Sequence, residues 1–167
     1  MATDNSMQQR STPPLSRILV AVDGSEESLN AADYAIGLLL SSSTVREKEE
    51  EDNNRELVVL TVTHIPSVFD ISSPSALEQW KERDRIESKK WFDRIRKNAE
   101  QNKVKVREEL IESSLAVEAV IVDYAEKENV DLIVVGTRGR SGFKRLLLGS
   151  VASGVVTYAT KPVIIVK

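Results

Sequence analysis

Strand-like runs alternate with helical patterns along most of the chain, and this alternation constrains the fold more than any other feature. The runs are residues 18–22, 57–62, 104–110, 132–135 and 162–166. Between them, apolar residues recur at intervals of three and four, as in helices with one buried face. Alternating strands and helices predict a mainly parallel sheet covered on both faces and joined by right-handed crossovers. We therefore expect an α/β fold in the order βαβαβαβαβ.

The ends of these segments carry local signals. Ser25 is a natural N-cap, with two glutamates in the first turn of a helix that runs to about residue 41. Ser75 and Glu78 have capping-box spacing and open a long charged helix to about residue 101. The run 104–110 alternates polar and apolar residues, which predicts a strand at an edge of the sheet or in a half-exposed position. Ser113 or Ser114 is the expected cap of the following helix.

A glycine-rich loop at residues 136–150 lies between a buried run and a helix expected to begin near Val151. A helix start directs backbone N–H groups and positive potential at one point, where an anion fits well. Glycines allow the backbone to come close to a phosphate. Two interpretations stay open: a phosphate cradle, or a tight connection whose glycines serve turn geometry. The loop lacks Gly-Lys-Ser or Gly-Lys-Thr, so P-loop phosphoryl transfer is not expected.

A second loop, Asp23-Gly24-Ser25, follows the first strand. Open parallel sheets bind ligands at the carboxyl ends of their strands, where the strand order reverses. If the first and fourth strands are neighbours, both loops face one crevice. The residues alone leave Asp23 either a ligand-binding residue or a turn former. The basic side chains of the glycine-rich loop either steer an anionic ligand or are simply solvated: Arg138, Arg140, Lys144 and Arg145.

Composition excludes several kinds of chemistry. The net charge of −3 argues against non-specific nucleic-acid binding. The chain has no cysteine and one histidine, His64, so thiolate and histidine-rich metal sites are excluded. No apolar run approaches the roughly 20 residues of a membrane span. Residues 1–16 are expected to be a disordered tail without a secretory signal, and 42–55 a charged loop insertion. The expected compartment is the cytoplasm, and also the nucleus.

Residues 18–25, residues 130–136 and the glycine-rich loop together resemble the universal stress protein family over about residues 16–167. The nucleotide-binding branch of that family carries Gly, two residues, Gly, nine residues, Gly, and then Ser or Thr. Gly136, Gly139, Gly149 and Ser150 match this pattern in full. The resemblance implies one Rossmann-like domain over 17–167, a doubly wound five-stranded parallel sheet ordered 3-2-1-4-5. This is the adenine nucleotide alpha hydrolase-like fold, and the implied ligand is ATP, ADP or AMP.

The resemblance also implies roles for individual residues. Ala21, Val22 and Val62 would contact the adenine, and Asp23 would lie near the ribose and phosphates or bind a phosphate-bound Mg²⁺ or Mn²⁺. The ribose and phosphates would be bordered by Gly136, Arg138 and Gly139. N–H and hydroxyl donors to the phosphates would come from Gly149, Ser150, Val151 and Ser153. One departure is the segment 113–115, Ser-Ser-Leu, where the family often has a glycine near the ribose.

The function implied is a nucleotide-dependent switch in the stress response, acting as a homodimer in which strand 163–166 pairs with its copy. An exposed apolar edge strand would otherwise be a template for pairing. Two alternatives stay open: a slow ATPase, and a chaperone-like stress protein with a vestigial nucleotide site. We assign no catalytic residue, because only Asp23 and the distant His64 could activate water. At most weak hydrolysis is therefore expected.

Overall fold

The computed structural model describes residues 15–41, 55–65, 73–140 and 148–167. All five strands lie in one parallel sheet, in the order β3-β2-β1-β4-β5. Their bounds are β1 Arg17–Ala21, β2 Glu56–His64, β3 Lys105–Ser113, β4 Leu132–Gly136 and β5 Val163–Val166. The predicted fold class and strand order are confirmed.

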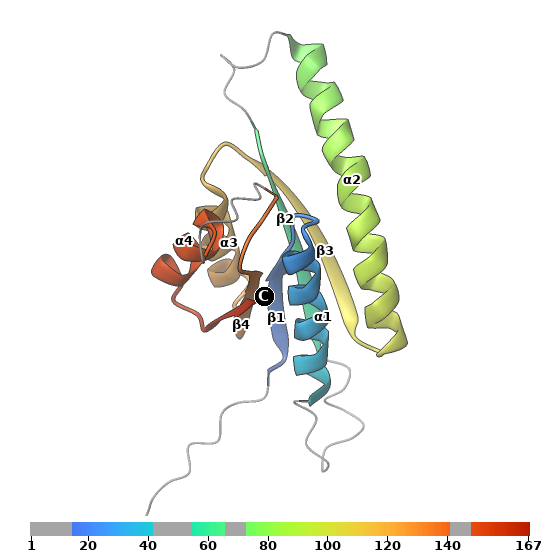
Figure 1. The fold of residues 1–167 in the computed structure, drawn as a ribbon, viewed down its shortest axis with the longest axis vertical. Coiled ribbons are helices and arrows are strands. Elements are labelled where there is room, and N and C mark those ends of the chain that lie inside the picture. Colours follow the sequence, from blue (N-terminus) through green and yellow to red (C-terminus); the bar gives the residue numbers. More distant parts are fainter. Residues whose placement is uncertain (1–14, 42–54, 66–72, 141–147) are drawn as a thin grey trace, which may run out of the picture.

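Four helices cover the two faces of the sheet (Figure 1). They are α1 Glu26–Ser41, α2 Pro74–Gln101, α3 Val117–Lys127 and α4 Ser150–Tyr158. Side chains alternate between the faces, so Ile18 and Val20 pack on the face of α1 and α2, while Leu19 packs on the face of α3 and α4. Because both faces are buried, the central strands are continuously apolar rather than alternating.

The strand order reverses between β1 and β4. These strands are neighbours, with Leu19 paired to Ile133 and Ala21 to Val135. After β1 the chain continues toward β2, and after β4 it continues toward β5, so the two connections diverge. The adjacency on which the expected crevice depended is therefore present. Such a divergence at the carboxyl ends of parallel strands is where doubly wound sheets bind ligands.

Helix starts follow the prediction once and depart from it twice. Ser25 caps α1, because its Oγ accepts the Ser28 N–H at 3.3 Å. The cap of α2 is Ser73, whose Oγ accepts the Ala76 N–H at 3.2 Å, so the prediction of Ser75 is wrong. Pro74 occupies the first helical position, where its fixed φ and missing N–H are tolerated, and this sets the start earlier.

The predicted cap of α3 at Ser113 or Ser114 is also wrong. Strand β3 extends to Ser113, which pairs with His64, and this ladder keeps the segment extended. Helix α3 starts at Val117 without a side-chain cap bond. The predicted edge position of β3 is correct, and its charges are paired to α2 and α3: Arg96 with Glu108, and Arg107 with Glu128.

Leu15 and Ser16, the last two residues of the expected tail, contact the rest of the chain. Leu15 packs against the core, and the Ser16 N–H donates to Asp131 Oδ2 at 2.8 Å. Residues 1–14 of the expected tail and 42–54 of the expected insertion lie outside the described residues, as do Lys144 and Arg145. Among the described helices, none is both long and apolar enough to cross a membrane.

Gly136 ends β4 directly against the start of α1. A Cβ added there would lie 2.8–2.9 Å from backbone atoms of Glu27 and Ser28, which cannot move without shifting the helix. We expect Gly136→Ala to lower the free energy of unfolding by about 1–3 kcal/mol, as overpacking does. Urea denaturation measures this change.

Gly37→Ala is the matched control, because it adds the same methyl group within α1 with nothing inside 4 Å. Helix propensity alone predicts that it stabilises the protein by about 0.5–1 kcal/mol. Equal effects of the two substitutions would contradict the close packing of Gly136.

Candidate functional site

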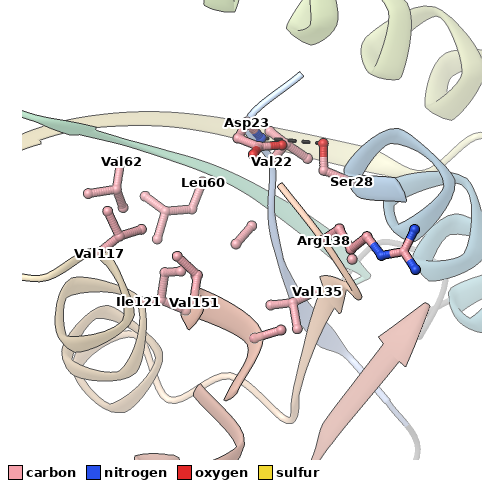
Figure 2. A pocket seen from close by; sticks show the side chains of 13 residues that line it. Val22, Asp23, Ser28, Leu60, Val62, Val117, Ile121, Val135, Arg138 and Val151 are labelled. Atoms are coloured by element: carbon pink, nitrogen blue, oxygen red, sulfur yellow. Dashed lines mark hydrogen bonds between the residues drawn. The ribbon is translucent and has the colours of Figure 1, made fainter. Parts of the chain in front are cut away.

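A cavity opens at the carboxyl ends of β1, β2 and β4, on the face covered by α3 and α4 (Figure 2). Its walls are mostly apolar and come from five elements: Ala21, Leu60, Val62, Val117, Ile121, Val135 and Val151. Polar groups of Asp23, Ser28 and Arg138 lie at its other side. An apolar slot beside a few polar groups is the usual character of a small-molecule site.

Strand β2 is longer than β1, and this leaves a polar backbone edge at the cavity. The Leu60 carbonyl accepts the Val22 N–H at 2.9 Å, so the backbone groups of Leu60 point toward β1. Val62, two residues further on, presents its N–H and C=O to the same side. The last paired residues of β1 and β2 are Ala21 and Leu60. The N–H and C=O of Val62 therefore lie beyond the end of β1. One donor and one acceptor thus border an apolar slot.

The start of α4 supplies the positive end of the site. Gly149 is the N-cap residue, with extended φ and ψ of −70° and 162°, and α4 has no side-chain cap bond. The first intrahelical bond closes from the Ser153 N–H to the Gly149 carbonyl at 2.9 Å. The N–H groups of Ser150, Val151 and Ala152 therefore precede the helical ladder. Val151 and Ala152 line the cavity, so this helix start faces it.

Asp23 joins the two loops of the switch point. Its Oδ1 accepts the Ser25 N–H at 3.0 Å and the Ser25 hydroxyl at 2.6 Å, while its Oδ2 accepts the Arg140 N–H at 2.9 Å. The carboxylate is therefore both a turn former and a tie to the glycine-rich loop. The two roles that the sequence left open for Asp23 do not exclude each other, because three of roughly four acceptor positions are occupied.

The close packing of the glycine-rich loop explains two glycines of the motif. A Cβ at Gly139 would lie 2.5 Å from Asp23 Oδ2, so a larger residue there displaces the carboxylate or the loop. The Gly149 N–H donates to the Thr137 carbonyl at 2.7 Å, and a Cβ would lie 3.3 Å from that oxygen. Both glycines thus shape the loop around Asp23 and the helix start.

Arg138 contributes to the cavity on a different side from α4. In Figure 2 its guanidinium points toward α1, away from Val151. Its Nε is buried and has no hydrogen-bond partner within the part of the chain that the structure describes. A buried donor without a partner is costly, so an acceptor from a ligand would stabilise it.

The structure brings most of the predicted residues to one place. Seven line the cavity: Ala21, Val22, Asp23, Val62, Gly136, Arg138 and Val151. Gly139 adjoins Asp23, and Gly149 and Ser150 form the start of α4, whereas the amide of Ser153 is used inside the helix. The segment 113–115 is not among the lining residues. Contacts of these residues with a ligand stay predictions.

Sequence reasoning missed six lining residues: Ser28, Leu60, Val117, Ile121, Val135 and Ala152. Val117 and Ile121 were expected only on the apolar face of a helix, and Leu60 and Val135 only in buried strands. The available signal was position, since each precedes or follows a loop at the carboxyl end of the sheet.

A metal site made by the protein alone is not present among the described residues, which hold no group of three carboxylate or histidine side chains. Asp23 is a single carboxylate with most of its acceptor positions occupied. A divalent cation here would need most of its ligands from a bound phosphate and water, as Mg²⁺ commonly does.

The chain is a doubly wound α/β protein with a cavity at the switch point of its sheet. The sequence matches the universal stress protein family over residues 14–167. It is 33% identical over 151 residues to universal stress protein MJ0531 of Methanocaldococcus jannaschii, covering 90% of this chain and 81% of that protein. It is 34% identical over 153 residues to universal stress protein YxiE of Bacillus subtilis, covering 90% and 98%. The chain belongs to the universal stress protein family.

Solved structures share the fold. Universal stress protein UspA from Lactobacillus plantarum superposes with a TM-score of 0.77 at 21% identity, covering 93% of this chain and 100% of that one. Three others contain nucleotides. One is an Arabidopsis thaliana family member with AMP bound, with a TM-score of 0.57 at 15% identity, covering 91% of each chain. Another is an Archaeoglobus fulgidus protein with dAMP, with a TM-score of 0.57 at 22% identity, covering 92% of this chain and 99% of that one. A third family structure is a complex with cAMP (0.59, 23%, 92% and 97%).

Removing the Asp23 carboxylate should loosen both loops. Asp23→Ala leaves the N–H groups of Ser25 and Arg140 without their acceptor. We expect the free energy of unfolding to fall by about 1–3 kcal/mol. Thermal or urea denaturation measures this loss in the absence of any ligand.

Asp23→Asn is the matched control, because it retains one carbonyl oxygen and should lose less stability. Wild-type stability in Asp23→Ala would contradict the structural tie. A measured loss also means that reduced ligand binding in this variant is not by itself proof of metal binding.

Proposed function

We propose that this protein binds an adenine nucleotide in the switch-point cavity and acts as a nucleotide-dependent regulatory protein of the stress response. The observation that carries the proposal is the meeting of three features: an apolar slot, a free backbone edge at Val62, and the start of α4. Family members of the same fold that contain AMP, dAMP or cAMP support it.

The base belongs in the apolar slot between Ala21, Val62 and Val117. Adenine presents a donor and an acceptor side by side on its Watson–Crick edge, and the C=O and N–H of Val62 complement them. Apolar walls exclude water from these bonds and strengthen them. A base without this donor–acceptor order would leave the Val62 groups unpaired, which favours adenine over guanine.

The phosphates belong at the start of α4, where the N–H groups of Ser150, Val151 and Ala152 and the helix dipole favour negative charge. ATP is the proposed physiological ligand, with AMP and ADP sharing the same base and first phosphate. Mg²⁺ or Mn²⁺ would accompany the phosphates, with Asp23 as its single protein carboxylate. A role in hydrolysis is not part of the proposal, because Asp23 is the only carboxylate among the described residues that line the cavity.

A substitution that deletes one backbone N–H tests the phosphate site. Ser150 is the first residue of α4, where proline is tolerated, and Gly149 already has the extended conformation that a following proline requires. We expect Ser150→Pro to weaken AMP binding at least about ten-fold, since hydrogen bonds to charged groups are the strong ones. Adenosine, which lacks the phosphate, should bind both proteins equally.

Isothermal titration calorimetry with AMP, ATP and adenosine measures these affinities. Ser150→Ala is the matched control, because it keeps the N–H and removes only the hydroxyl, and it should lose less affinity for AMP than Ser150→Pro does. Absence of saturable binding of AMP and ATP to the wild-type protein would overturn the proposed function. Equal losses of affinity for AMP and for adenosine in Ser150→Pro would mean that the phosphates bind elsewhere.

We also propose a homodimer through β5 and a cytoplasmic location, with the nucleus as a further compartment. Strand β5 is an edge of the sheet, and its residues are half-buried. The Pro162 and Val166 carbonyls accept bonds from β4, so by alternation the backbone groups of Val163 and Ile165 point outward. An outward apolar edge is suited to pairing with its copy.

Ile165→Pro removes one outward N–H without breaking a bond to β4. We expect it to convert the dimer to monomers, while Ile165→Val, which keeps the N–H, should remain dimeric. Size-exclusion chromatography with light scattering measures the mass, and circular dichroism checks the fold. A folded Ile165→Pro dimer would place the interface elsewhere.

A further inference from the structure

Helix α2 contacts both loops that form the proposed nucleotide site, although none of its residues lines the cavity. Figure 1 shows α2 beginning beyond the carboxyl ends of the strands and running back along the sheet. Two side-chain connections link it to the switch point: Trp91 to the turn at Asp23, and Arg140 to the acidic side of α2.

The first connection supports the turn from the face opposite the cavity. The Trp91 ring lies directly over Gly24, where an added Cβ would be 2.6 Å from two ring carbons. Gly24 has a φ of +82°, which other residues adopt rarely. The contact therefore depends on a glycine beside Asp23, in a backbone conformation that a Cβ would strain.

A hydrogen-bond relay completes this contact. The Trp91 Nε1–H donates to Thr61 Oγ1 at 3.2 Å, and the Thr61 hydroxyl donates to the Val22 carbonyl at 3.1 Å. Thr61 is buried, so these bonds are sheltered from water. Val22 lines the cavity and precedes Asp23. The position of Trp91 is thus transmitted to backbone that borders the site.

The second connection joins the glycine-rich loop to α2. The Arg140 N–H holds Asp23 Oδ2, while its guanidinium lies 2.9 Å from Glu87 and 3.8 Å from Asp84 of α2. Asp84 in turn accepts a hydrogen bond from Thr63 at the end of β2. The Arg140 side chain is 55% exposed, so this ion pair is weak and easily broken.

We propose that α2 positions the nucleotide site and responds to nucleotide binding there, with Trp91 and Arg140 as the positioning residues. The inference rests on the proposed nucleotide binding and names how that site is regulated. Any ligand or partner that displaces residues 84–91 of α2 loosens the Asp23 turn and the loop together. By linkage, nucleotide binding strengthens the contacts of α2 by the same factor.

Fluorescence of Trp91 tests the coupling, in a Trp80→Phe background that leaves one tryptophan. Titration with AMP should change the Trp91 emission, because the ring lies against the turn that holds Asp23. Arg140→Gln should weaken AMP binding about three-fold, the size expected for an exposed ion pair, and reduce the emission change. Arg140→Lys, which keeps the charge, should restore at least part of both.

Arg96→Gln is the matched control, because Arg96 pairs with Glu108 from the same helix at a distance from both loops. It should leave the affinity and the emission change as in the wild type. Hydrogen exchange of α2 residues 84–91 should slow on AMP binding in the wild type, and slow less in Arg140→Gln. A purely structural role for Arg140 would alter stability without altering these responses.

The outcomes separate the two proposals. If the Trp80→Phe protein and the wild type both fail to bind AMP, the proposed function is overturned, and this inference with it. If they bind AMP while Arg140→Gln matches them in affinity, emission and exchange, only the coupling through α2 is overturned. Equal losses in Arg140→Gln and Arg96→Gln would also overturn it, because any weakened ion pair of α2 would then have the same effect.

Discussion

The pairing of β1 with β4 at the centre of the sheet is the contact on which the site depends. These neighbouring strands lead into helices on opposite faces, so their connections must diverge where the strands end. The described residues leave a cavity at this point, and the backbone of the longer β2 extends past the end of β1 beside it. The Asp23 carboxylate then ties the two diverging loops together. The cavity and the Asp23 tie thus follow from the strand order and do not depend on a ligand.

Much of this could be predicted from the sequence because burial on both faces leaves a strong signal. The runs 18–22, 57–62 and 132–135 are continuously apolar, and only a covered parallel sheet explains several such runs. Strand order came from the family resemblance, since periodicity carries no information on which strands are neighbours. Helix starts were less certain: Pro74 and the extension of β3 each overrode a serine that looked like a cap. A side-chain N-cap contributes about 1 kcal/mol to stability, which is less than a ladder of strand hydrogen bonds contributes.

The site was partly predictable for a similar reason. The glycines and Asp23 can be recognised in the sequence, because they directly follow buried apolar strands, where such residues indicate a special loop. Val117 and Ile121 are not, since an aliphatic residue that lines a cavity looks the same as one that fills a core. The roles of Trp91 and Arg140 required the structure as well, because both reach across elements far apart in the chain. The glycines now have two explanations at once, as packing requirements and as loop formers, so their presence alone is weak support for a ligand.

Titration of isotopically labelled protein with AMP, followed by amide chemical shifts, locates the bound nucleotide directly. We predict that the largest shifts fall on Val62 near the end of β2 and on Ser150, Val151 and Ala152 at the start of α4, with smaller shifts around Asp23. Adenosine should reproduce the shift at Val62 but not those of α4. Saturable shifts that avoid both places, or no shifts at AMP concentrations well into the millimolar range, would contradict it.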